Sequence, residues 1–238
     1  MAWLDGWRPA LGDGKHSHLN GGVGLSGNAG TYEAGWDNTW NAWLATTSAN
    51  WDTALACEAN ATWTSSAGGN ENKPINCISW YEATAFCIWD GGFLPSEAEW
   101  NFAAAGGAEQ RYYPWSSPAS STSIDCDRAN YSVSYPSDSC VGGPNVAGFS
   151  SPDGDGRFGQ ADMAGSLWEL TFDWYHVDYL MPCVDCARNN STEQFPHRQI
   201  RGGAYSNAAS AVRANGLRGS NLPESRDDTI GARCGRAP

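Results

Sequence analysis

The sequence predicts an α+β fold with two helices, an irregular antiparallel sheet and many loops. Two capping boxes, each followed by an apolar face, predict the helices. Short apolar runs between turn-rich segments predict the strands. The 28 glycines and 13 tryptophans are typical of irregular backbone that large buried rings hold in place. Helices beside an antiparallel sheet define the α+β class.

The first helix is expected to begin at a capping box in residues 79–82, which read Ser-Trp-Tyr-Glu. An apolar face follows it as far as Trp89, where Asp-Gly-Gly ends the pattern. Residues 96–99, Ser-Glu-Ala-Glu, form a second capping box. We expect the helix after it to continue to Ala105 and to stop at the next two glycines.

Three short segments read as strands: residues 166–172, 199–201 and 229–233. A further short helix is predicted over residues 37–44, because Trp36, Trp40 and Trp43 recur at helical spacing. Those tryptophans could face the core or form a stacking platform for a sugar, and buried packing is favoured. No linker, charge block or repeat divides the chain, so residues 1–238 are interpreted as one domain.

The charge pattern excludes some classes of partner. The formal net charge of −12 and the pI of about 4.6 argue against nucleic acid and against anionic membrane surfaces, which require a basic footprint. No run of about 18 apolar residues is present, so no membrane span is expected. The first residues lack the basic and apolar regions of a signal peptide. Cations or neutral ligands fit this composition better.

The eight cysteines form an even set. They could form disulfides in an oxidising compartment or hold a metal in a reducing one. Only residues 183–186 read Cys-x-x-Cys, and a structural zinc site would need a second pair, so disulfides are favoured. An extracellular, periplasmic or cell-surface location follows. Eight cysteines allow 105 pairings, among which the sequence alone does not choose.

Several motifs occur together in one order between residues 74 and 234. They are residues 74–83 (Pro-Ile-Asn-Cys-Ile-Ser-Trp-Tyr-Glu-Ala), 93–100 (Phe-Leu-Pro-Ser-Glu-Ala-Glu-Trp), 113–115 (Tyr-Pro-Trp), 162–170 (Asp-Met-Ala-Gly-Ser-Leu-Trp-Glu-Leu), 201–203 (Arg-Gly-Gly) and 226–234 (Arg-Asp-Asp-Thr-Ile-Gly-Ala-Arg-Cys). With them the chain resembles the formylglycine-generating enzyme family, also called the sulfatase-modifying factor family.

This resemblance implies a variant of the C-type lectin fold, with bound calcium and a groove that holds extended peptide in the catalytic members. Two departures are visible. Residues 165–170 read Gly-Ser-Leu-Trp-Glu-Leu instead of the family's Gly-Asn-Val-Trp-Glu-Trp, and the family's N-terminal strands are missing. We therefore expect a single domain that is truncated at its N-terminus.

The family's redox cysteines should stand where this chain has Asn207 and Val212. A thiolate is both the nucleophile and the metal ligand in that chemistry, and neither an amide nor an isopropyl group replaces it. The resemblance therefore implies the family's fold without its best-known reaction, and no copper is expected.

The resemblance also implies two calcium sites, because calcium takes six to eight oxygen ligands. The first would use the Glu169 carboxylate with main-chain carbonyls near Gly165 and Leu167. The second would use Asn130, the Tyr131 carbonyl, Asp138 and the Cys140 carbonyl. His16 and His18 lie in a Gly-rich segment and are weak candidates for a separate metal site.

Disulfide pairing follows from two sources. Cys87 and Cys234 match a family disulfide. The remaining pairs are expected from proximity in the sequence: Cys57 with Cys77, Cys126 with Cys140, and Cys183 with Cys186.

The leading hypothesis is a non-catalytic, secreted module that binds a protein, peptide or glycan through residues 204–228. A variant of it is a binding protein diversified by a retroelement, with variable residues between the Arg-Gly-Gly and Gly-x-Arg motifs. The alternative is a formylglycine-generating-enzyme-like oxidase that acts on peptides. The residues expected on the binding face are Tyr205, Asn207, Arg213, Asn215, Arg218 and Asn221.

Overall fold

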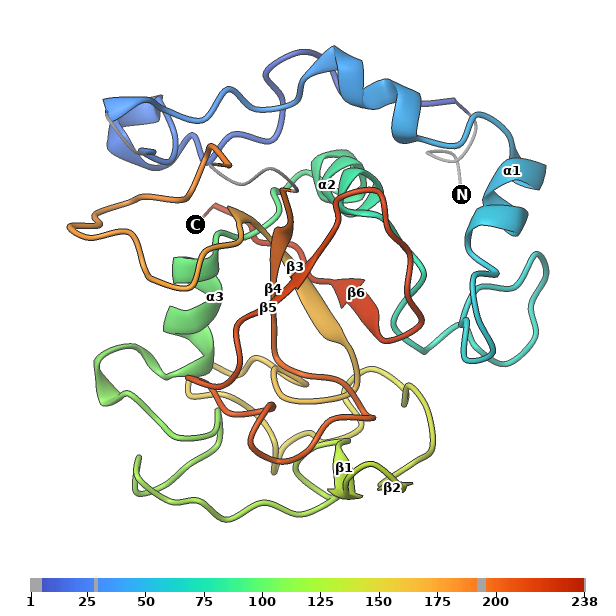
Figure 1. The fold of residues 1–238 in the computed structure, drawn as a ribbon, viewed down its shortest axis with the longest axis vertical. Coiled ribbons are helices and arrows are strands. Elements are labelled where there is room, and N and C mark those ends of the chain that lie inside the picture. The colour runs from blue at the N-terminus through green and yellow to red at the C-terminus, as the bar shows by residue number, and fades with distance from the viewer. Residues whose placement is uncertain (1–5, 28–29, 192–195, 238) are drawn as a thin grey trace.

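The computed structural model describes residues 6–27, 30–191 and 196–237. The architecture is α+β, as the sequence predicts. A small sheet lies at the centre, helices α2 and α3 lie beside it, and long loops make up much of the surface (Figure 1). The N-terminal segment passes across the end of the molecule that carries α2 (Figure 1).

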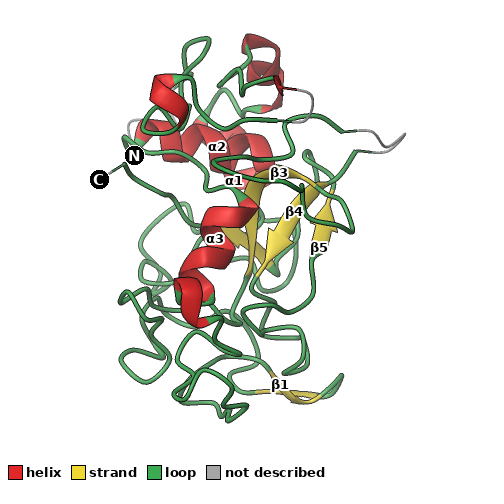
Figure 2. Ribbon diagram, turned by 90° about the vertical axis from the view of Figure 1, so that its left-hand side faces the viewer, coloured by secondary structure: helices red, strands yellow, loops and turns green. Residues whose placement is uncertain are grey.

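The two helices with capping boxes form as expected. Helix α2 spans Trp80–Trp89 and helix α3 spans Glu97–Ala104. In each box the serine hydroxyl accepts the N–H of the glutamate three residues later, and the glutamate side chain accepts the N–H of the serine. These reciprocal bonds satisfy helix N–H groups that have no partner inside the helix. Figure 2 shows both helices on the same side of the sheet.

The remaining helices are short. Helix α1, Ser48–Ala54, was not expected, because its only buried residue is Trp51 and one residue gives no periodicity. The helix expected over residues 37–44 is the 3-10 helix η4, Asn38–Trp43. The tryptophans at and before this helix differ in burial. Trp36, just before it, is buried, whereas Trp43 is 49% exposed and stacks on Tyr81. Two further 3-10 turns lie among the described residues: η2, Asn20–Gly22, and η5, Gly107–Glu109.

The central sheet has the strand order β5-β4-β3-β6. The strands are β3 (Trp168–Trp174), β4 (Arg198–Arg201), β5 (Gly219–Asn221) and β6 (Ile230–Ala232). The β3–β4 and β4–β5 pairs are antiparallel, as expected, but β3 and β6 are parallel. Strand direction is a long-range property that short apolar runs do not encode. A separate two-stranded ladder joins β1 (Ser132–Ser134) and β2 (Asp138–Ser139).

The main core lies between α2 and the sheet, where Trp80 meets Leu170, Ile200 and Ile230. A guanidinium is buried at its edge. The Cζ atom of Arg198 lies 3.5 Å from the centre of the Trp80 ring and 3.6 Å from that of Trp174. Burial lowers the pKa of Arg198 to about 9. The two indole faces offset part of that cost through cation–π attraction.

Four disulfides link the loops, and they are the four pairs expected from the sequence: Cys57–Cys77, Cys87–Cys234, Cys126–Cys140 and Cys183–Cys186. No cysteine is left free. The second of them joins positions 147 residues apart and ties the end of α2 to the chain after β6. Closing so long a loop restricts the unfolded chain most. Within the part of the chain that the structure describes, no helix is both long and apolar enough to cross a bilayer.

His16 attaches the N-terminal segment to α3. Its side chain is fully buried, with Nδ1 3.0 Å from Glu33 Oε2 and Nε2 3.2 Å from Glu99 Oε2. Burial alone would lower the pKa of His16, but the hydrogen bonds and charges of Glu33 and Glu99 outweigh it and raise the pKa to about 9. The imidazolium therefore bridges two carboxylates, which uses His16 as an internal ion-pair partner.

This bridge makes stability depend on pH. The folded protein holds the His16 proton more tightly than the unfolded chain, whose histidine pKa is about 6.5. The stabilisation is complete below about pH 6.5 and is lost as the pH rises through about 9. We expect the free energy of unfolding to fall by up to about 3 kcal/mol across this window. Urea unfolding at a series of pH values should show this fall in the wild type and in His176→Gln, but not in His16→Gln.

Candidate functional site: the C-terminal loop face

The chain after β4 leaves the sheet through two glycines. Gly202 and Gly203 have φ angles of 94° and 71°, in the region that glycine adopts without strain. A Cβ on Gly203 would lie 2.7 Å from Val212 Cγ1. The loop segment that follows therefore packs directly on its own start.

Arg201 holds this loop segment from inside. Its side chain is 1% exposed, and its guanidinium donates to the carbonyls of Ala214, Gly216 and Leu217 at 2.9 to 3.1 Å. Main-chain carbonyls of irregular backbone thereby gain partners, and Ala214 also accepts from Asn101 Nδ2 at 3.0 Å. The loop is positioned by contacts to its backbone.

Glu97, at the start of α3, completes this anchor. Its carboxylate is 4% exposed and lies 3.7 Å from Arg201 Nε. The same carboxylate accepts from Arg218 Nε at 2.6 Å and from the second arm of that guanidinium. One buried carboxylate thus forms ion pairs with two guanidinium groups, one from β4 and one from the segment before β5.

Asn207 and Val212, where the resemblance would place the family's redox cysteines, have structural roles. The Asn207 side-chain oxygen accepts the N–H of Ala204 at 2.9 Å and closes a turn. Val212 is 1% exposed and packs in an apolar cluster with Tyr113, Tyr131 and Ala164. Neither side chain is a nucleophile or a metal-binding thiolate.

Tyr205 was expected on the binding face, but the structure buries it. The residue is 7% exposed, and its hydroxyl contacts Asn60 Nδ2 at 2.9 Å and Asp228 Oδ1 at 3.3 Å. Burial and the charge of Asp228 raise the pKa of Tyr205 to about 12. The ring faces inward because both of its hydroxyl partners lie inside.

The other residues expected on the binding face differ in their exposure and in their side-chain partners. Arg213 donates to the Ser210 carbonyl and lies 5.5 Å over the Tyr112 ring, and Arg218 is bound to Glu97. Asn221 is half-buried in β5, whereas Asn215 is exposed. We therefore redefine the C-terminal loop face by the exposed residues of the 204–228 segment. These are Ser206, Ser210, Asn215, Leu217, Ser220 and Glu224.

In the first expected calcium site, the Glu169 carboxylate already has hydrogen-bond and ion-pair partners. Glu169 accepts from Trp100 Nε1 at 2.6 Å and forms two 2.6 Å hydrogen bonds with Arg233. Arg233 Nη2 also donates to the Ala161 and Asp162 carbonyls at 3.2 Å. As folded here this set does not fit a calcium ion, because a guanidinium occupies the position facing the carboxylate. The Gly165 carbonyl accepts the N–H of Leu167.

The residues of the second expected calcium site fit better. Asn130 is 1% exposed; its Nδ2 donates to the Gly143 carbonyl at 2.9 Å, and its Oδ1 has no hydrogen-bond partner among the described residues. The Tyr131 carbonyl accepts the N–H of Cys140, which leaves it a second lone pair. Asp138 stands on the neighbouring strand β2. A buried oxygen without a donor is a suitable cation ligand.

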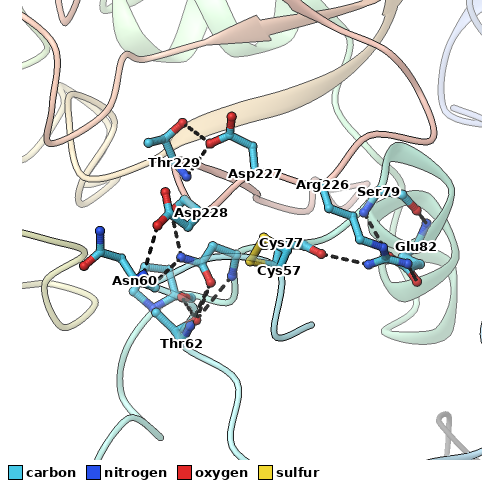
Figure 3. Close-up of a disulfide and its surroundings, with 12 residues drawn as sticks. Cys57, Asn60, Thr62, Cys77, Ser79, Glu82, Arg226, Asp227, Asp228 and Thr229 are labelled. Atoms are coloured by element: carbon cyan, nitrogen blue, oxygen red, sulfur yellow. Dashed lines mark hydrogen bonds and ion pairs between the residues drawn. A yellow bond between two sulfur atoms is a disulfide. The ribbon is translucent and has the colours of Figure 1, made fainter. Parts of the chain in front are cut away.

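A polar network links the Cys57–Cys77 loop to the C-terminal segment. Asn76 Nδ2 donates to the Asp228 carbonyl at 2.7 Å, and the N–H of Asn60 donates to the Asp228 carboxylate at 2.9 Å. Arg226 binds the Cys77 carbonyl and Glu82 (Figure 3). Sequence reasoning missed this network and the Glu97 anchor, because ion pairs that join residues more than 100 positions apart leave no local pattern.

Together these features define a disulfide-linked α+β domain in which loops held by buried arginines form the exposed face. The sequence profile described as the Sulfatase-modifying factor enzyme 1-like domain matches residues 28–238. The chain therefore belongs to the sulfatase-modifying factor family.

The relatives show how much of the family's proteins this chain covers. It is 27% identical over 197 residues to the formylglycine-generating enzyme of Mus musculus, which covers 81% of this chain and 50% of that protein. It is 28% identical over 174 residues to the inactive C-alpha-formylglycine-generating enzyme 2 of Bos taurus, which covers 69% of this chain and 52% of that protein. The chain thus spans about half the length of these relatives.

A solved structure shows the same fold. Treponema denticola variable protein 1 matches with a TM-score of 0.54 and 19% identity, over 77% of this chain and 78% of that one. At this identity the likeness concerns the fold alone.

The Glu97 anchor gives a stability prediction. We expect Glu97→Gln to lower the free energy of unfolding by about 3–5 kcal/mol, because it leaves the buried Arg201 guanidinium without a carboxylate. Glu109→Gln is the matched control, since Glu109 pairs with Arg111 and Arg157 at the surface, where ion pairs contribute little. Chemical unfolding of both variants checks this. Equal, small losses in the two would show that the anchor does not stabilise the fold.

Proposed function

We propose that this chain is a non-catalytic binding module of an oxidising compartment, which binds a protein, peptide or glycan through its C-terminal loop face. One observation carries the proposal. The two positions of the family's redox pair hold a turn-closing amide and a buried valine, and all eight cysteines are in disulfides. No thiolate is then left to act as the nucleophile or as the metal ligand.

The anchoring of the loop supports a role in binding. Arg201 bonds to main-chain carbonyls, so the exposed side chains of Asn215 and Leu217 can change without loss of those bonds. This suits a surface whose exposed residues differ between copies of the protein, as in the proposed retroelement-diversified variant. The fold likeness to a protein named a variable protein is in line with it.

The compartment and the kind of partner follow from the chemistry. Four disulfides are consistent with an oxidising compartment, and we place the protein outside the cell, in a periplasm or at a cell surface. The net charge of −12 favours a neutral or cationic partner over nucleic acid.

We further propose that calcium binds the second site. Asn130 Oδ1, Asp138 and the Tyr131 and Cys140 carbonyls would hold it, and the Cys126–Cys140 disulfide closes the segment that carries them. Its contribution would be structural, because calcium bound to the native state alone stabilises that state.

Calcium at about 100 times its dissociation constant should stabilise the fold by about 2.7 kcal/mol. Melting curves with calcium and with chelator should therefore differ for the wild type. Asp138→Asn should shrink the difference, while Asp127→Asn, a change of the same charge at another exposed position, should not. Identical melting curves with calcium and with chelator would contradict a calcium site.

The absence of catalysis is tested by turnover. The protein is incubated with copper, oxygen and a peptide that carries a sulfatase-type cysteine motif, and the peptide is read by mass spectrometry. We expect no formylglycine above the control without protein, whereas a catalytic formylglycine-generating enzyme assayed in parallel should form it. Product formed by this chain would favour the oxidase alternative.

Binding is tested in a separate experiment, in which the protein is applied to peptide and glycan arrays. Binding of a ligand to the C-terminal loop face should be abolished when Asn215 and Leu217 are both changed to glutamate. It should be unchanged when the exposed Ala98 on α3 is changed to glutamate. Ligands that survive the face variant would place the binding surface elsewhere.

A further inference from the structure

A pocket lies beside the loop that the Cys57–Cys77 disulfide closes, and it is separate from the C-terminal loop face. It has a volume of about 540 Å³ and lies between α1, α2 and the loop of residues 62–75. Figure 1 shows α1 and this loop at the same side of α2 and β6. None of its lining residues belongs to the 204–228 segment. Its volume falls within the range of small-molecule sites, about 300–1,000 Å³.

The walls of this pocket are apolar. Trp51 contributes from α1, Leu55 from the position just after α1, Ala83 and Phe86 from α2, and Ala232 from β6. The polar contribution to the surface is small and comes mainly from the loop of residues 62–75. An apolar ligand body would gain free energy by leaving water for these walls.

Three charged side chains line the pocket, and two of them already have hydrogen-bond or ion-pair partners within the protein. The Glu82 carboxylate is bound by Arg226 and by the N–H of Ser79. The Glu71 carboxylate accepts the N–H groups of Gly68 and Gly69 at 2.6 and 3.0 Å.

The third is Lys73, one of two lysines in the chain. No described carboxylate lies within 4.0 Å of its ammonium group, and its side chain forms no hydrogen bond with the rest of the described protein. Lys73 is thus the one charged lining side chain without a hydrogen-bond or ion-pair partner among the described residues, in a protein of net charge −12.

We propose that this pocket binds a straight-chain fatty carboxylate, with the alkyl chain against the apolar walls and the carboxylate at Lys73. A monoanion fits better than a phosphate dianion, because Glu71, which has no cationic partner, already places one negative charge at the pocket that holds Lys73. The apolar walls exclude a small hydrophilic anion, which would gain nothing from them. The site is independent of the C-terminal loop face.

The test is a calorimetric titration of the whole protein with hexanoate, octanoate, decanoate and dodecanoate, each below its micelle concentration. Each added methylene should strengthen binding about fourfold until the pocket is full. Decanol, which has the same chain without the charge, should bind about tenfold more weakly than decanoate. Affinity independent of chain length, or equal for decanoate and decanol, would overturn the proposal.

Variants locate the site. Lys73→Gln should weaken decanoate about tenfold and leave decanol unchanged, whereas Lys15→Gln, which changes the other lysine, should alter neither. Thr64→Trp, at an exposed lining position, should block both ligands while the melting temperature is kept. Decanoate affinity unaffected by both Lys73→Gln and Thr64→Trp would refute this pocket as the site. Binding to anionic phospholipid vesicles without binding of monomeric decanoate would also refute it, because it would identify a membrane surface as the ligand.

Discussion

The structure of the C-terminal half depends on one interaction, the buried ion pair between the Arg201 guanidinium and Glu97. It joins three parts of the fold: strand β4, the first residue of α3, and the carbonyls of residues 214–217. A buried charge is costly unless it is paired and hydrogen-bonded. Here three carbonyls accept hydrogen bonds from the Arg201 Nη atoms, and the Glu97 carboxylate supplies the opposite charge 3.7 Å from Nε. Irregular backbone is thereby fixed where no strand ladder is available to fix it.

Two other ion pairs, each between a buried glutamate and a half-buried arginine, repeat this arrangement. Arg233 joins Glu169 on β3 to the carbonyls of residues 161 and 162, and Arg226 joins Glu82 on α2 to the Cys77 carbonyl. In each case an arginine near the C-terminus uses one part of its guanidinium for a carboxylate and another for main-chain oxygens. The small sheet and two short helices therefore organise many loops, and the outer side chains of those loops remain free for recognition.

Local signals in the sequence predicted the local structure. The capping boxes at Ser79 and Ser96 identified α2 and α3, because reciprocal capping bonds are encoded within four residues. The disulfides followed from the resemblance and from spacing in the sequence. The inward position of Tyr205, the Arg233–Glu169 pair and the lysine at the apolar pocket were not predictable, because each depends on residues brought together by the whole fold. The parallel pairing of β6 with β3 is of the same kind.

The most direct measurement is hydrogen exchange of the native protein, read by mass spectrometry over residues 202–218. The amides of Tyr205, Ala211, Ala214 and Gly216 donate to main-chain carbonyls within this framework. We expect their exchange to be slowed to a degree similar to that of β4, and to become fast in Glu97→Gln. Exchange at the rate of an unstructured peptide in the wild-type protein would contradict a loop segment held in place by the buried arginine.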